Sequence, residues 1–181
     1  MSLRAHIPNA ITSLNLLCGV VGVVFALDGR PGDAFLLMLA AGVFDFCDGL
    51  AARLLDARSP IGGELDSMAD MTSFGVLPSV MLYACMKELG CAAPLCFIPL
   101  LIAVFSGIRL AKFNIDERQH SSFLGLPTPS SAIICGSIAA FCHARPDSAF
   151  TSLCSLPFAI PLLAAIICVL LVSEVPMFSF K

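Results

Sequence analysis

The sequence has no tryptophan and a single tyrosine, and charged side chains make up only 13% of it. Without tryptophan, the aromatic belt that membrane proteins often place at both interfaces is thin. No dense cluster of lysine and arginine indicates nucleic-acid binding, and the formal net charge is −3. There is also no low-complexity linker, internal repeat or separate soluble region. We therefore predict one domain, residues 1–181.

The side chains that are abundant are apolar. Hydrophobic residues make up 58% of the sequence, and the mean hydropathy is +0.94. Soluble domains have a much lower apolar share and about twice this share of charge, roughly 25%. The composition therefore predicts an all-α fold, a polytopic bundle of transmembrane helices.

The nine cysteines indicate no metal site or disulfide framework, because none forms a CxxC pair. They sit singly in apolar runs and are interpreted as small buried hydrophobic residues in a reducing or lipid setting. The three histidines share no ligand spacing, and we assign them no catalytic role. They are His6, His120 and His143.

About six apolar runs are long enough to cross a bilayer. The first is too long for a signal peptide and is not followed by an A-x-A-like cleavage site, so we expect a retained span. The fifth is the shortest and is rich in Ser, Gly and Ala, which favour tight helix packing. The predicted spans are about 9–27, 33–55, 63–86, 94–112, 129–143 and 153–172.

The distribution of positive charge predicts the orientation in the membrane. With six spans, the side that holds both termini has seven of the ten Lys and Arg residues, and this excess indicates the cytoplasm. The seven are Arg4, Arg53, Arg58, Arg109, Lys112, Arg118 and Lys181. We expect a multi-pass protein of the cell's inner or plasma membrane, with its termini and active site cytoplasmic.

The most informative stretch is 44–73, which holds four aspartates in an otherwise apolar region. At about 100° per residue, the two in its first half share one arc of a helix with Gly49 and Ala52. The two in its second half share a stripe with Gly62 and Ser73. A break at Ser59–Pro60 would let the two helices run antiparallel and turn both stripes toward each other. The four are Asp45, Asp48, Asp66 and Asp70.

Four carboxylates at membrane depth need compensating positive charge. Each costs roughly 2.5–3.5 kcal/mol on insertion scales, they repel one another, and Arg53 alone cannot balance them. Oxygen ligands without nearby His or Cys favour Mg²⁺ or Mn²⁺, and two such ions about 3.5–4 Å apart recur in phosphoryl transfer. The small residues beside the acids leave room for a bulky ligand. A structural acidic cluster is the alternative.

The pattern Asp45-x-x-Asp48-Gly49-x-x-Ala52-Arg53, followed after eight residues by Gly62-x-x-x-Asp66-x-x-x-Asp70, resembles the signature of the CDP-alcohol phosphotransferases. All eight signature positions are filled. The resemblance implies two divalent cations, Mg²⁺ or Mn²⁺, and a homodimer. It also implies the roles of the residues. The metal ligands are Asp45, Asp48, Asp66 and Asp70, the general base for the acceptor hydroxyl is Asp70, and the CDP site includes Gly49, Ala52, Arg53 and Gly62.

The start of the first span is amphipathic, and its polar residues Asn9, Thr12 and Asn15 could reach a headgroup or nucleotide. Helix capping and packing is the other interpretation. Similar Pro-Asn-x-x-Thr starts occur in the family in association with nucleotide contacts. The resemblance therefore implies that Asn9 and Thr12 belong to the CDP site.

A second polar stretch follows the fourth predicted span. Arg109 and Lys112 are either anchors at the membrane surface or an anion site, in which Arg109 would pair with a carboxylate or phosphate. The segments 109–114, 123–129 and 172–181 are similar to integral-membrane phosphatidylserine synthases. This implies that Arg109, Lys112 and Thr128 bind serine. Some members carry further spans, so the chain corresponds to a short form or a truncation.

The reaction that the resemblance implies is transfer of a phosphatidyl group from CDP-diacylglycerol to L-serine, which gives phosphatidylserine and CMP. A related enzyme that uses glycerol-3-phosphate or an inositol phosphate stays open, since cations also surround the predicted acceptor site. A divalent-cation transporter is the alternative from another class. A transporter would not need the signature's small residues and arginine at this spacing.

Overall fold

A computed structural model describes residues 6–57, 59–115 and 125–173, and in these ranges every regular element is helical. This agrees with the predicted all-α fold. The elements are α1 (His6–Leu27), α2 (Pro31–Leu54), α3 (Pro60–Asp70), the π-helical turn η2 (Met71–Val76), α4 (Leu77–Glu88), α5 (Ala93–Cys96), the 3₁₀ turn η3 (Ile98–Leu100), α6 (Leu101–Ile115), α7 (Thr128–Ala144), α8 (Ala149–Cys154) and α9 (Ala159–Val172).

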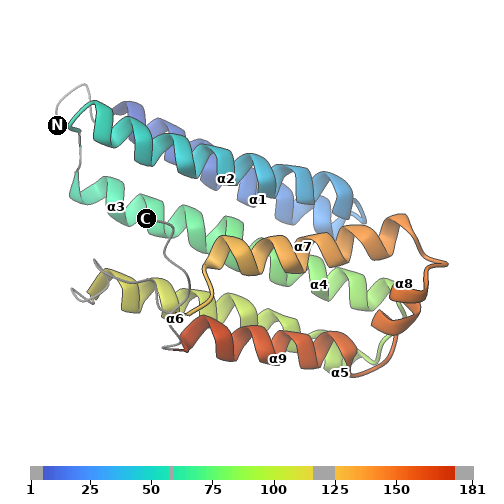
Figure 1. The fold of residues 1–181 in the computed structure, drawn as a ribbon. Helices are drawn as coiled ribbons and strands as arrows, with labels where there is room; N and C mark the ends of the chain where they lie inside the picture. Colours follow the sequence, from blue (N-terminus) through green and yellow to red (C-terminus); the bar gives the residue numbers. More distant parts are fainter. Residues whose placement is uncertain (1–5, 58, 116–124, 174–181) are drawn as a thin grey trace.

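The long helices lie roughly along one common axis and form a bundle (Figure 1). Along one edge α1 packs against α2, in the middle α7 lies beside α4, and along the opposite edge α6 packs against α9. The helix α1 also contacts α3, η2 and α4, whereas α2 and α3 make few direct contacts. Thus α1 is the common wall that holds the two halves of the acidic stretch together.

Two glycines let α1 approach its neighbours closely. A Cβ atom on Gly19 would lie 2.5 Å from Ser73 Oγ, and one on Gly22 would lie 2.7 Å from Leu77 Cδ2. Both distances are shorter than side-chain contacts allow, so only glycine fits without a shift. In lipid there is no hydrophobic driving force between helices, so close van der Waals packing at small residues holds them together.

The predicted break at Ser59–Pro60 is confirmed. Pro60 opens α3, where its missing N–H leaves no bond unmade, and the Ser59 hydroxyl caps the helix by accepting a hydrogen bond of 3.0 Å from the Gly62 N–H. Asp56 precedes this cap with φ 47°, a left-handed conformation that aspartate tolerates better than most residues. The chain therefore reverses between α2 and α3 at the point that the sequence indicates.

The segment from Pro60 to Glu88 is helical throughout, but its hydrogen bonding changes directly after Asp70. In η2 the turn is widened, and the Leu77 N–H donates to the carbonyl of Thr72, five residues earlier. Pro78 follows at the start of α4 and has no N–H to donate. Wide turns of this kind are rare and often lie at functional sites.

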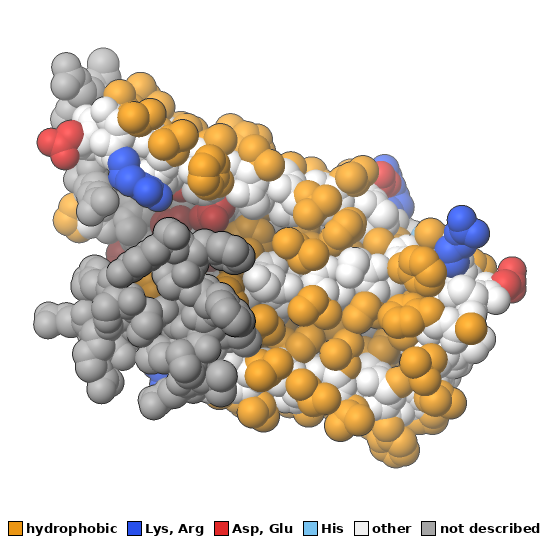
Figure 2. Space-filling model, in the orientation of Figure 1, with side chains coloured by type: hydrophobic (Ala, Val, Ile, Leu, Met, Phe, Trp, Pro, Cys, Tyr) orange, Lys and Arg blue, Asp and Glu red, His pale blue; other side chains and the backbone are white. Residues whose placement is uncertain are grey.

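Three of the helical segments are long and apolar enough to cross a membrane by length and composition: His6–Leu27, Pro31–Leu54 and Ala93–Asn114. The predicted count of six spans is not confirmed. Large apolar side chains project outward from several helices, and Figure 2 shows them over the middle of one face, with charged side chains toward its two ends. This surface fits a membrane protein.

The last predicted span is wrong in its first part. Instead of one helix over 153–172, the short helix α8 ends at Cys154 and α9 begins at Ala159. Pro157 lies in this gap, and since proline has no N–H it breaks the helical ladder there. Figure 1 shows α8 at the end of the bundle and α9 within it.

Some sequence predictions fall outside the described residues. These are the topology charges Arg4, Arg58, Arg118 and Lys181, His120, positions 123 and 124 of the serine-synthase-like segment 123–129, and positions 174–181 of the segment 172–181.

Candidate active site

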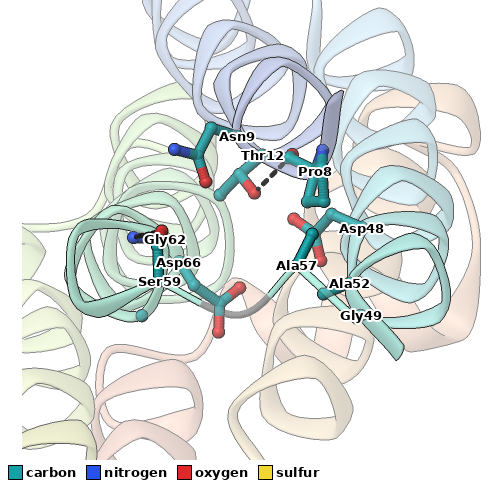
Figure 3. A pocket seen from close by; sticks show the side chains of 11 residues that line it. Pro8, Asn9, Thr12, Asp48, Gly49, Ala52, Ala57, Ser59, Gly62 and Asp66 are labelled. Carbon is teal, nitrogen blue, oxygen red and sulfur yellow. Dashed lines mark hydrogen bonds between the residues drawn. The ribbon is translucent and has the colours of Figure 1, made fainter. Parts of the chain in front are cut away.

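A pocket of about 250 Å³ opens where α1 meets the ends of α2 and α3 (Figure 3). Five of the residues predicted to contact CDP line it, namely Asn9 and Thr12 from α1, Gly49 and Ala52 from α2, and Gly62 from α3. Two of the predicted metal ligands, Asp48 and Asp66, line it as well. The structure thus brings together residues that are more than 50 positions apart in sequence.

The pocket also has lining residues that the sequence did not single out. They are Pro8, Ala57, Ser59 and Gly63. Ala57 and Ser59 come from the reversal between α2 and α3, whose path could not be read from helical periodicity. The pattern Pro8-Asn9 at the start of α1 was the available signal for Pro8.

Glycine at position 62 is required for the shape of this pocket. A Cβ atom there would lie 2.9 Å from Asn9 Oδ1 and 3.1 Å from Ser59 Oγ. Thr12 is only 3% exposed, and its hydroxyl donates to the carbonyl of Pro8 at 3.0 Å. Asn9 on α1 therefore lies directly against Gly62 on α3, and any larger residue at position 62 would narrow the pocket.

Arg53 is exposed and belongs to the rim rather than to the lining of this pocket. Its Nε–H donates to the carbonyl of Gly49 at 3.1 Å, which holds the side chain against α2. Its other guanidinium nitrogens leave it able to meet an anion at the rim. Its predicted contact with CDP stays a prediction.

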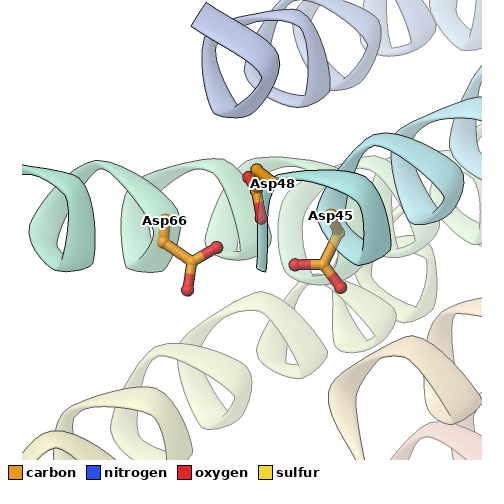
Figure 4. Close-up of side chains that lie close together, drawn as sticks. All are labelled: Asp45, Asp48 and Asp66. Carbon is orange, nitrogen blue, oxygen red and sulfur yellow. The ribbon is translucent and has the colours of Figure 1, made fainter. Parts of the chain in front are cut away.

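Three acidic side chains converge beside the pocket (Figure 4). One carboxylate oxygen each from Asp45, Asp48 and Asp66 lies within 4.8 Å of the others. Asp45 and Asp48 are one turn apart on α2, and Asp66 reaches them from α3. The predicted meeting of the two acidic stripes is confirmed for these three, although α1 and not direct packing of α2 on α3 holds them in place.

The burial of these three carboxylates favours the binding of a metal ion between them. Asp48 is 6% exposed, and its Oδ2 is buried without a hydrogen-bond partner within the described ranges. Asp45 and Asp66 are half-buried. Like charges this close, with an oxygen left unpaired, are unfavourable unless a cation binds among them. Carboxylate oxygens alone fit a hard divalent cation, so the trio could hold one.

Asp70 does not belong to this group of three. It follows Asp66 by one turn and lies close enough to Asp45 and Arg109 for their charges to interact. Its Oδ1 is buried without a hydrogen-bond partner in the part of the chain that is described. Its predicted roles as general base and as fourth metal ligand stay predictions. Its position outside the group of three carboxylates suits the role of general base.

The residues predicted to bind the acceptor lie in different surroundings. Arg109 is half-buried, and its Nε is buried with no hydrogen-bond partner among the described residues. Lys112, one turn further along α6, is exposed. Thr128 is 1% exposed at the start of α7 and does not line the pocket of Asp48 and Asp66. Of these three residues, Arg109 is the one shown to lie close to an acid, Asp70.

A sequence profile described as CDP-alcohol phosphatidyltransferase matches residues 5–175, nearly the whole chain. The chain belongs to this family. The match includes the three helices α1, α2 and α3, which carry the pocket and the acids. The family match therefore covers the whole of the candidate site.

Curated relatives carry more specific names. The CDP-diacylglycerol–serine O-phosphatidyltransferase of Mycobacterium tuberculosis strain H37Rv is 38% identical over 134 residues, which are 70% of this chain and 46% of that protein. The protein of the same name from Bacillus subtilis is 38% identical over 125 residues, 68% of this chain and 70% of its own length. The archaetidylserine synthase of Methanothermobacter thermautotrophicus is 33% identical over 134 residues, 70% of this chain and 54% of that protein.

The matched region spans about half the length of two of these three relatives. Both names describe enzymes that form a serine phospholipid.

Proposed function

We propose that this protein transfers a phosphatidyl group from CDP-diacylglycerol to the hydroxyl of L-serine, which gives phosphatidylserine and CMP. The observation that carries the proposal is the convergence of Asp45, Asp48 and Asp66 beside a pocket lined by the small residues of the family signature. The names of the relatives support serine as the acceptor.

The surroundings of Asp70 and Arg109 also favour serine. Each has a buried polar atom without a hydrogen-bond partner within the described ranges, and the two side chains are close enough to interact. A small amino acid with a hydroxyl and a carboxylate can contact both side chains at once. Its carboxylate would pair with Arg109 and its hydroxyl would donate to Asp70.

In this proposal Asp45, Asp48 and Asp66 hold divalent cations, with Asp70 contributing at the edge of the group. When bound, such cations would stabilise the negative charge of the phosphates and would make CMP a better leaving group. The residues of the chain do the rest. The pocket of α1, α2 and α3 accepts the cytidine and its phosphates, and Arg53 meets their charge at the rim. Asp70 takes the proton of the serine hydroxyl, which is a poor nucleophile at neutral pH.

We further propose that the site faces the cytoplasm, as the predicted distribution of Lys and Arg indicates, and that the protein is a homodimer, as the family resemblance implies. Among the described residues, the two ends of the bundle carry equal numbers of Lys and Arg. The end near the site has Arg53, Arg109 and Lys112, and the opposite end has Arg30, Lys87 and Arg145 between or after its helices. The proposed orientation therefore rests on the sequence, in which the side predicted to hold both termini has seven of the ten Lys and Arg residues.

The direct test is CMP release by purified protein from CDP-diacylglycerol with Mg²⁺ or Mn²⁺. L-serine, glycerol-3-phosphate and an inositol phosphate are compared as acceptors. We expect release that needs both serine and the metal. Release only with a phosphorylated acceptor would retain the family chemistry and refute serine, and no release with any acceptor would refute the proposed activity.

Replacing Arg109 by alanine should raise the apparent KM for serine about tenfold or more, which corresponds to about 1.4 kcal/mol of lost binding. The KM for CDP-diacylglycerol should change little, because Arg109 lies beside Asp70 and not in the lining of the CDP pocket. Steady-state kinetics with each substrate varied in turn measures both constants. Arg145→Ala removes an exposed arginine beyond α7 and is the matched control. An unchanged KM for serine would return Arg109 to the role of a membrane anchor.

Replacing Gly62 by valine should raise the apparent KM for CDP-diacylglycerol about tenfold or more. The new side chain would begin 2.9 Å from Asn9 Oδ1 and would fill the space between α1 and α3. The KM for serine should move less. Gly32→Val is the control, since a Cβ atom at Gly32 has no neighbour within 4 Å. An equal KM for CDP-diacylglycerol in Gly62→Val and the wild type would show that CDP does not bind in this pocket.

A further inference from the structure

Asn15 lies on the buried side of α1, one turn beyond Thr12, but it is not part of the pocket that Thr12 lines. It is 0% exposed. The Ser73 hydroxyl, from the widened turn η2, lies 2.7 Å from Asn15 Oδ1 and 3.1 Å from the Asn15 backbone carbonyl. Both acceptors belong to Asn15, so the hydroxyl donates to this residue from across the bundle.

This contact determines which way the amide of Asn15 points. Because Oδ1 accepts from Ser73, the amide nitrogen must lie on the other side of the side chain. That nitrogen, Nδ2, is buried without a hydrogen-bond partner in the described part of the chain. Asn15 neighbours Asp70, whose Oδ1 is buried and equally unpaired. The two neighbouring side chains thus contribute a buried donor and a buried acceptor, and leaving both unpaired is unfavourable.

We propose that Asn15 is a positioning residue for Asp70. Its Nδ2–H donates to one oxygen of the Asp70 carboxylate and leaves the other oxygen directed at the acceptor hydroxyl, and Ser73 sets the orientation of the amide. This inference rests on the proposed function, in which Asp70 is the general base. Asn15 itself touches no substrate.

The backbone of α1 leaves room for this contact because a glycine lies next to it. Gly19 lies one turn after Asn15, and a Cβ atom there would stand 2.5 Å from Ser73 Oγ and 3.1 Å from Ser73 Cα. Ser73 therefore lies directly against the backbone of α1. Asp70 immediately precedes the widened turn that holds Ser73. One short segment thus carries both the proposed base and the hydroxyl that orients its partner.

The test is a double-mutant cycle with Asn15→Ala, Ser73→Ala and the double variant, assayed by CMP release. We expect Asn15→Ala to lower kcat about 10- to 100-fold, the range that a small displacement of a catalytic group costs. Ser73→Ala should lower kcat less, about tenfold. The double variant should be no slower than Asn15→Ala, since Ser73 acts through Asn15. The KM for CDP-diacylglycerol and the Mn²⁺ concentration at half-maximal rate should stay near wild type in all three.

Three results would overturn the inference: a wild-type kcat for Asn15→Ala, a wild-type kcat for Ser73→Ala, or a double variant whose loss is the product of the single losses. A purely structural role would lower the melting temperature without this pattern. If Asn15→Ala does not fold, Asn15→Leu fills a similar volume without a donor and replaces it in the cycle. A wild-type protein that releases no CMP with any acceptor refutes the proposed function instead, so the two failures are distinguishable.

Discussion

Replacing Asp70 by asparagine is expected to lower CMP release by about 10³-fold or more, within the range that general bases contribute. Asparagine has nearly the same shape but cannot take the proton of the serine hydroxyl. Asp70 lies outside the group of three converging carboxylates and outside the lining of the CDP pocket, so nucleotide binding should survive. Equilibrium binding of a radiolabelled cytidine nucleotide, measured beside turnover, checks both statements.

Asp56→Asn is the matched control for this substitution. Asp56 is exposed between α2 and α3, and asparagine tolerates its positive φ of 47° well. The control should keep wild-type turnover. Wild-type turnover in Asp70→Asn as well would remove Asp70 from the mechanism, and a loss of nucleotide binding in that variant would place Asp70 in the substrate site instead.

Replacing Asp66 by asparagine should weaken metal binding as well as turnover. Asp66 provides the only carboxylate from α3 in the trio, so its loss leaves both remaining ligands on one turn of α2. We expect the Mn²⁺ concentration at half-maximal rate to rise by at least about tenfold, because even residues that only support a ligand cost that much. Direct Mn²⁺ binding, followed by electron paramagnetic resonance of the free ion, should show the same shift without any substrate present.

The two aspartate variants separate the roles of the site. Asp66→Asn should shift the Mn²⁺ midpoint more than Asp70→Asn does, and equal midpoints for Asp66→Asn and the wild type would refute the metal assignment. Uptake of Mn²⁺ into sealed vesicles addresses the transporter hypothesis. Flux through the wild-type protein without CMP release would favour transport, and we expect release without flux.

The sequence predicted those parts of the site that depend on a single helix. Helical periodicity placed Asp45 and Asp48 on one arc, and the Ser59–Pro60 break gave the reversal that brings Asp66 to them. The requirement for a small residue at Gly62 was also visible, because a signature glycine beside acids indicates close approach of a ligand or chain. Each of these follows from local geometry, which a sequence determines directly.

The parts that the sequence did not predict depend on which helices meet. Periodicity predicted facing stripes on α2 and α3 but could not show that α1 would pack against both helices and hold them together. Ser73 was on the predicted stripe, yet its partner Asn15 lies 58 positions away, and no short-range signal links the two. The interruption at 155–158 was missed because its apolar residues, Leu156 among them, read as a continuous span.

The packing of α1 against both α2 and α3 has a consequence for how the protein is made. Chains are synthesised from the N-terminus, so the hairpin of α1 and α2 exists before α3 has left the ribosome. At that time Asp45 and Asp48 lie in an apolar hairpin with no third acid to complete the group, a state that the bilayer disfavours. Only when the segment after Pro60 has settled across α1 can the carboxylates be enclosed. The site is thus a late product of biogenesis, and substitutions at the α1 crossing, such as at Gly19, should show first as degraded nascent chains.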